Sequence, residues 1–282
     1  DFAAPHTRTN VATVDADDVD PQTDTAVVNV IRPSGQCSMD VTISTDGSCP
    51  AGEEVFILTG TEVTWCVSVY NGIQADLATI LASYTTDGGQ NYTAMGDLGP
   101  LATGGTASAQ FNQIIADDTT LEATAVATDV YGNIYSCDAD DAKANVVHPS
   151  LNIIKTVVVA SDGDCANSTD PLDVVAGTEV NYCYEVSNTG DTDLVNIAVT
   201  DDKLGAIGNI ASLVVGATQT IKSGAVAIPV DTDNIGTANG EDVYGFPVND
   251  NDDASVNAQF ADVVVDKAGP STVVVSTDNS ID

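Results

Sequence analysis

The feature that most constrains this chain is an internal repeat of about 115 residues. The segment TVVV occurs at 156–159 and again at 272–275, a step of 116 residues. Asp-Val-Tyr-Gly occurs at 129–132 and at 242–245, and Asp-Asp-Ala follows both copies. A unit of this length is a normal size for one β-sandwich. The repeat therefore predicts a sandwich that the chain makes twice.

Three Pro-Ser pairs mark the boundaries of the repeat. Each pair precedes a strand rich in valine or isoleucine. Proline cannot donate to a sheet ladder, so it suits the entry to a first strand or a joint between domains. We place an N-terminal hairpin segment at 1–32, sandwich domains at 33–148 and 149–269, and a C-terminal strand at 270–282.

Composition favours an all-β fold. Aromatic residues are only 5% of the chain, and valine, threonine, alanine and glycine dominate. β-Branched residues between polar turns are typical of many short strands. No helical period is sustained. The expected fold is all-β, with two tandem sandwiches, an N-terminal hairpin and a C-terminal strand able to pair with another subunit.

The formal charge of −35 arises from 42 acidic and 7 basic residues. Such a chain lacks the basic patch that nucleic acids or an anionic membrane surface require. The high negative charge keeps the protein soluble and attracts cations. We expect no nucleic-acid partner and no membrane insertion, and a saline or calcium-containing setting fits the charge.

Six cysteines occur without any CxxC pair, which favours disulfides over zinc. Cys49 with Cys66 and Cys165 with Cys183 stand at equivalent sites of the two units. The remaining pair is Cys37 with Cys137; the alternative is that one of them bridges to a neighbouring subunit. Disulfides predict an oxidising, extracellular location. The chain begins without a Met, which we interpret as processing, or else as a cloning boundary.

Strict alternation in the segment 63–69 puts Val63, Trp65, Val67 and Val69 on one face and Cys66 on the other. Trp65 and its counterpart Tyr182 are therefore predicted core residues, with the disulfides on the outer face.

Several motifs carry a family resemblance. They are Gly-Thr-Glu-Val-x-Tyr-Cys, Val-Ser-Asn-Thr-Gly-Asp-Thr-Asp-Leu at 186–194, Val-Thr-Asp-Asp at 199–202 and the terminal Asp-Val-Tyr-Gly. With them the chain resembles the Ig-like conserved-repeat domains of large bacterial and archaeal surface proteins. The resemblance covers nearly the whole chain and is closest in the second unit; in the first unit, Asn-Gly-Ile-Gln-Ala-Asp-Leu at 71–77 replaces the Asn-Thr-Gly loop. It implies Ig-like sandwiches that serve as spacers, stalks or assembly parts, and it brings no catalytic residues.

Aspartates recur near the end of each unit, and hard oxygen ligands from adjacent loops suit Ca²⁺. The alternative is that these residues form solvated turns. No cofactor is otherwise expected. The candidate metal ligands are Asp129, Asp138, Asp140, Asp242, Asp250 and Asp252.

Two covalent modifications are worth stating. A Lys–Asn isopeptide bond is known in some Ig-like surface domains, and Lys155 with Asn257 is the pair to consider, but the first unit lacks a matching lysine. The sequons at Asn91 and Asn167 are glycosylation candidates, although a chain of this composition produces two by chance.

The ends of the chain suggest its function. The head resembles the last hairpin of a unit, and the tail resembles the first strand of another. We therefore expect a secreted subunit that polymerises head to tail by strand complementation. The alternative is a stalk or adhesin fragment that binds a glycan or a protein. Enzyme motifs are absent. The residues assigned to assembly are Val11, Val14, Val27, Val28, Val30, Thr272, Val273, Val274 and Val275.

Overall fold

The computed structural model describes residues 6–17, 19–30, 33–260 and 269. The chain divides into two compact units, 1–147 and 148–282. Regular structure in the described part is β-strand, apart from the short 3-10 helix η1 (Cys165–Asn167). This confirms the all-β class. The same part contains no helix long and apolar enough to cross a membrane.

The N-terminal segment is an antiparallel hairpin. β1 (His6–Ala16) pairs with β2 (Val19–Val30), so that Thr9 faces Val27, and the register shifts between Val14 and Ala16. Among the described strands, these two form a sheet of their own.

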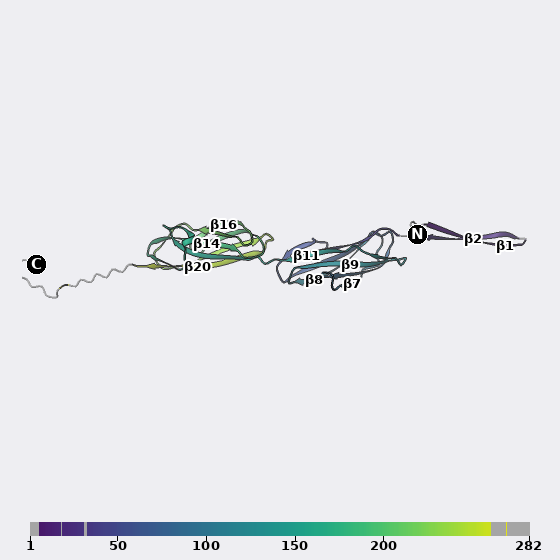
Figure 1. Cartoon of the computed structure of the whole chain (residues 1–282), viewed down its shortest axis with the longest axis horizontal. Helices are drawn as coiled ribbons and strands as arrows, with labels where there is room; N and C mark the ends of the chain where they lie inside the picture. Colours follow the sequence, from purple (N-terminus) through teal and green to yellow (C-terminus); the bar gives the residue numbers. More distant parts are fainter. Residues whose placement is uncertain (1–5, 18, 31–32, 261–268, 270–282) are drawn as a thin grey trace, which may run out of the picture. The chain divides into compact units, whose positions relative to one another are not determined.

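Unit 1 contains two further sheets (Figure 1). In the three-stranded antiparallel sheet, β5 (Thr61–Asn71) lies between β3 (Cys37–Ser44) and β8 (Thr106–Ile115). The other sheet contains β4 (Glu54–Ile57), β6 (Leu77–Thr85), β7 (Thr93–Asp97), β9 (Thr119–Asp129), β10 (Ile134–Ser136) and β11 (Asp140–Val146). Its order is β4–β11–β9–β6–β7, with β10 paired to β9 and β11 parallel to β4.

Unit 2 repeats this plan. One sheet contains β12 (Leu151–Val159), β14 (Thr178–Asn188), β17 (Thr218–Lys222) and β18 (Val226–Ile228), with β14 paired to the other three. The other contains β13 (Leu172–Val175), β15 (Leu194–Asp201), β16 (Gly205–Leu213), β19 (Thr232–Asp242) and β20 (Pro247–Gln259). Its order is β13–β20–β19–β15–β16, and β20 runs parallel to β13.

Each unit has its own apolar core between its two sheets. Trp65 on β5 and Tyr182 on β14 are 0% and 1% exposed. The core face predicted for β5 is confirmed, because Val63, Trp65, Val67 and Val69 belong to the core cluster of unit 1 and Cys66 does not. Burial itself does not alternate, since Thr64 and Cys66 are also buried. The cores are rich in valine and isoleucine, β-branched residues that fit a pleated, buried face, and alanine, leucine and aromatic residues complete them.

Candidate functional site

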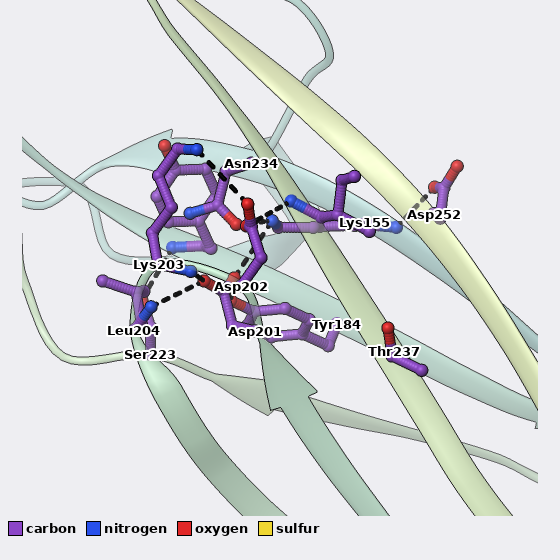
Figure 2. A network of polar contacts seen from close by, with 12 residues as sticks. Lys155, Tyr184, Asp201, Asp202, Lys203, Leu204, Ser223, Asn234, Thr237 and Asp252 are labelled. Carbon is purple, nitrogen blue, oxygen red and sulfur yellow. Dashed lines mark hydrogen bonds and ion pairs between the residues drawn. The ribbon is translucent and has the colours of Figure 1, made fainter.

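The most unusual site is a buried polar cluster in the core of unit 2. The Nζ atom of Lys155 lies 3.0 Å from Oδ2 of Asp201, and both side chains are wholly buried. The same Nζ donates a short hydrogen bond to Oδ1 of Asn234, which is 1% exposed. Figure 2 shows the side chains of Lys155, Tyr184 and Asn234 gathered around Asp201. An amine, a carboxyl and a carboxamide therefore meet away from water.

Strand periodicity places these groups inside the core. Lys155 is on β12 between Ile153 and Val157, and all three point to the buried face. Asp201 ends β15, and its Oδ1 accepts hydrogen bonds from the backbone N–H groups of Lys203 and Leu204 at 2.9 and 2.8 Å. The turn that follows β15 thus fixes the carboxyl.

Two tyrosine rings wall the amine. The Nζ atom of Lys155 lies 4.7 Å from the ring centroid of Tyr182 and 5.5 Å from that of Tyr184. The Tyr184 hydroxyl also donates to Asp201 Oδ2 at 2.5 Å. Gly236 leaves the room for this packing, because a Cβ there would lie 2.8 Å from Tyr184 Cε1 and 3.1 Å from Lys155 Cδ.

Burial controls the protonation of the cluster. It lowers the pKa of the Lys155 amine, although the nearby Asp201 carboxylate opposes this. Burial alone would raise the pKa of Asp201. The hydrogen bonds from Tyr184, Lys155 and the backbone outweigh that effect and hold it below its usual range. Burial, together with the hydrogen bond to Asp201, raises the pKa of Tyr184. The amine therefore faces an acceptor for its proton.

Unit 1 has no such cluster in its described core. The strand registers place Val41 at the position of Lys155, Tyr84 at that of Asp201 and Leu121 at that of Asn234. Unit 1 has two apolar residues and an aromatic ring at these positions. The three polar groups therefore occur together in one repeat and are absent together in the other.

The lysine partner considered from the sequence was wrong. Asn257 is exposed on β20, and its Nδ2 donates to Asp173 Oδ1 at 2.9 Å. Neither Asn234 nor Asp201 was predicted from the sequence, although Asp201 lies in the Val-Thr-Asp-Asp motif at 199–202. The sequence signal that could have indicated this cluster is Lys155 itself, a lysine at an inward position of an apolar strand, where it needs buried polar partners.

The six aspartates proposed as calcium ligands are not brought together. Among the described residues, no group of three His, Cys, Asp or Glu side chains could hold a metal ion. Asp129 and Asp242 instead organise equivalent turns. Asp129 Oδ1 accepts from the N–H groups of Tyr131 and Asn133, and Asp242 Oδ1 accepts from those of Tyr244 and Phe246.

The other four aspartates connect the last strands of a unit to its first strand. Asp140 Oδ2 accepts from the Val41 N–H at 2.7 Å. In unit 2, Asp250 accepts from the Ile153 N–H at 3.0 Å and Asp252 from the Lys155 N–H at 2.7 Å. Asp138 accepts from the side chain of Gln36 and pairs with β3 through its backbone. These carboxylates join the two sheets of each sandwich along one edge.

The cysteines form the same three pairs that were expected. Cys49–Cys66 and Cys165–Cys183 are equivalent disulfides in the two units. Cys37–Cys137 belongs to unit 1 alone, and its two residues are 100 positions apart in the sequence. It joins β3 to the segment between β10 and β11. The described part contains no free cysteine.

The predicted assembly residues are only partly described. Val11, Val14 and Val27 lie on the hairpin and are 55%, 72% and 58% exposed. Val28 and Val30 belong to β2, and Thr272 to Val275 lie outside the described residues. The sequon residues Asn91 and Asn167 are both exposed.

A hollow of about 380 Å³ lies on the outer face of the β3–β5–β8 sheet, next to Cys49–Cys66. Its lining includes the small polar residues Thr42, Ser68 and Ser108. A similar hollow lies next to Cys165–Cys183 in unit 2. The two hollows repeat with the fold, each beside the equivalent disulfide of its unit.

No protein-family model matches the chain, and no curated protein sequence matches it. Among solved structures, it is similar to fibronectin(III)-like modules of Clostridium thermocellum CbhA, with 14% identity, TM-score 0.27, and coverage of 82% of this chain and 100% of the other. A tetra-tandem repeat from the extending region of a large adhesion protein has 17% identity and a TM-score of 0.27, and the match covers 90% of this chain and 57% of the other. Part of a 1.5-MDa bacterial ice-binding adhesin has 14% identity and a TM-score of 0.40, and the match covers 79% of this chain and 66% of the other. At these TM-scores the likeness supports no conclusion about function.

Proposed function

We propose that this chain is a structural segment of an extracellular surface protein, in which tandem sandwiches form a load-bearing spacer. The observation that carries the proposal is the repetition of one self-contained plan. Both units have corresponding strand orders, an equivalent disulfide and equivalent aspartate contacts to the first sandwich strand, although among the described strands β10 occurs only in unit 1 and β17 with β18 replaces a single strand in unit 2. Repeated modules in series lengthen a protein, because each module contacts only its neighbours and folds in the same way.

The covalent links fit mechanical work. In unit 1, the Cys37–Cys137 disulfide ties β3 to the residues just before β11, so a pull on the ends does not reach the sequence between them. Such disulfides form in oxidising surroundings, which agrees with an extracellular location.

The location can be tested on the cells that produce the protein. An antibody raised against the whole chain should label intact cells or their shed material, while an antibody against a cytosolic marker should label only permeabilised cells. Labelling confined to permeabilised cells would contradict the proposal.

A second candidate function is head-to-tail self-assembly, which the hairpin favours. Each of β1 and β2 pairs with only the other among the described strands, so each has one edge free to pair with a further strand. Val11 and Val27 lie on one face of this hairpin and are more than half exposed. A valine-rich strand of a second copy, such as 272–275, would satisfy this edge and cover these side chains.

Light scattering and negative-stain electron microscopy distinguish this candidate from a simple spacer. Removing residues 270–282, or introducing Val11→Lys, should convert filaments to single particles. Val175→Lys is the matched control, because Val175 is a valine of similar exposure, 64%, that lies on β13 and not on the hairpin. Single particles of the unmodified chain at all protein concentrations would rule out self-assembly and leave the spacer proposal intact.

A further inference from the structure

The buried cluster of unit 2 has no explanation as a stabilising ion pair alone. A buried salt bridge costs several kcal/mol of desolvation per ion, and apolar replacements of similar volume are often neutral or stabilising. Unit 1 shows that this fold accepts such replacements, with Val41 and Leu121 at the positions of Lys155 and Asn234. The three polar groups of unit 2 therefore call for a chemical role.

The arrangement has the parts of an amide-forming reaction. A desolvated lysine amine is a nucleophile. Lys155 Nζ contacts the carboxamide oxygen of Asn234, so the electrophilic Cγ is one bond away from the contacted atom. Asp201 lies within hydrogen-bonding distance of the same Nζ, where a general base would have to be. Water, which would compete as a nucleophile, is excluded by burial.

We propose that Lys155 and Asn234 become joined by an intramolecular isopeptide bond, and that Asp201 transfers the proton. Asp201 takes a proton from Nζ, and the freed lone pair attacks Cγ of Asn234. The new Nζ–Cγ bond forms and the Cγ–Nδ2 bond breaks. Nδ2 then takes the proton back from Asp201, the second surplus proton of the former ammonium group also passes from Nζ to Nδ2, and Nδ2 leaves as ammonium. No oxidant, reductant or cofactor is consumed.

The walls of the cluster hold the reactants in place. The rings of Tyr182 and Tyr184 confine the lysine, and the Tyr184 hydroxyl orients the Asp201 carboxyl. Held reactants lose the entropy of encounter before the reaction, which is a large part of the barrier in solution. Folding alone would thus bring about the reaction.

The bond would give unit 2 the counterpart of the unit 1 disulfide. Cys37–Cys137 ties β3, the first strand of the sandwich in unit 1, to the segment before β11. Lys155–Asn234 ties β12, the first strand of unit 2, to β19 across 79 sequence positions. Each unit would then contain one covalent link from its first strand to the opposite sheet, by different chemistry.

Mass spectrometry of the folded, reduced full-length chain tests the inference. The intact mass should be lower than the sequence mass by one ammonia, and a protease digest should contain one branched peptide with Lys155 joined to Asn234. Succinimide formation at Asn71-Gly72 or Asn239-Gly240 also releases ammonia. Identification of the branched peptide is therefore required, and ammonia loss located at an Asn-Gly pair would overturn the proposal.

Variants identify the roles. Lys155→Met and Asp201→Asn should both restore the sequence mass and abolish the branched peptide. Lys143→Met removes an exposed lysine of β11 and should leave both signals unchanged. Asp201→Asn retains an oxygen that can accept from the Lys203 and Leu204 N–H groups, so it guards against loss of folding in Lys155→Met. Separate linear peptides from the folded unmodified chain would overturn the proposal whatever the variants do.

Discussion

Val41 in unit 1 and Lys155 in unit 2 occupy the same place in the fold. The backbone N–H of each donates at 2.7 Å to a carboxylate oxygen of the facing strand, Asp140 Oδ2 and Asp252 Oδ2. Both side chains point into the core, 0% and 1% exposed. The repeat thus keeps a backbone contact and changes the chemistry behind it, from an isopropyl group to an amine.

The conserved backbone contact should stabilise both units. Asp140→Ala leaves the Val41 N–H without its acceptor, and we expect a loss of about 1–3 kcal/mol in the free energy of unfolding of unit 1. Asp141→Ala, a change at the exposed neighbouring residue, is the control. Urea unfolding provides the measurement, and equal effects of the two changes would show that the contact does not matter.

The three disulfides should contribute unequally to the free energy of unfolding. In the chain-entropy model, closing a loop of 100 residues contributes about 4.7 kcal/mol, and closing one of roughly 15 residues contributes about 3 kcal/mol. Replacing Cys37 and Cys137 by alanine should therefore destabilise unit 1 more than replacing Cys49 and Cys66. Calorimetry should show that the transition of unit 2 keeps its midpoint in both double variants.

Asp129 should make stability depend on pH. Burial would raise its pKa, but hydrogen bonds from Asn133, Tyr135 and Tyr131 hold it below its ordinary value. Such a group stabilises the fold above the unfolded-state pKa of about 3.9, and this contribution is lost as pH falls through the folded-state pKa. The destabilisation caused by Asp129→Asn should therefore be largest near neutral pH and shrink below about pH 4.

The high negative charge of the chain also makes stability depend on pH, and comparing Asp129→Asn with the unmodified chain at each pH removes this general effect. Asp117→Asn removes one negative charge at an exposed site and serves as the control for that effect. A destabilisation by Asp129→Asn that stays constant from pH 7 to about pH 3 would contradict the assignment.

Gly236 should be essential to the buried cluster. A Cβ at this position would lie 2.8 Å from Tyr184 Cε1, so Gly236→Ala must displace Tyr184 or Lys155. We expect a cost of about 1–3 kcal/mol and a lower yield of the Lys155–Asn234 linked peptide. Gly224→Ala is the matched control, because a Cβ there meets nothing within 4 Å. An unchanged peptide yield in Gly236→Ala would contradict this packing.

Local patterns predicted much of this fold. Alternation in β5 is a period-2 signal, so it identified Trp65 as a core residue directly. The equivalent positions of cysteines in the two repeats indicated the pairs Cys49–Cys66 and Cys165–Cys183. Both predictions rest on short segments of sequence or on their repetition. Aspartates were harder, since a carboxylate that accepts from a strand N–H, such as Asp140, has the same sequence signature as a metal ligand.

The polar cluster could not be read from local patterns. Lys155, Asp201 and Asn234 lie on three different strands, and the first and last are 79 positions apart. Only the register of β12, β15 and β19 brings them together. No spacing in the sequence of a single unit reports such a contact.

Stretching single molecules by their two ends tests the load-bearing account most directly. In the oxidised chain, no extension step the size of a whole unit should occur, because Cys37–Cys137 shields the sequence between its two cysteines and the Lys155–Asn234 bond shields the sequence between its two residues. Adding a reductant should release one step of about 330–360 Å, the extended length of the 100-residue separation in unit 1. The segment of unit 2 between Lys155 and Asn234, 79 positions apart, should still not extend. Two whole-unit steps in the oxidised, unmodified chain would contradict the account.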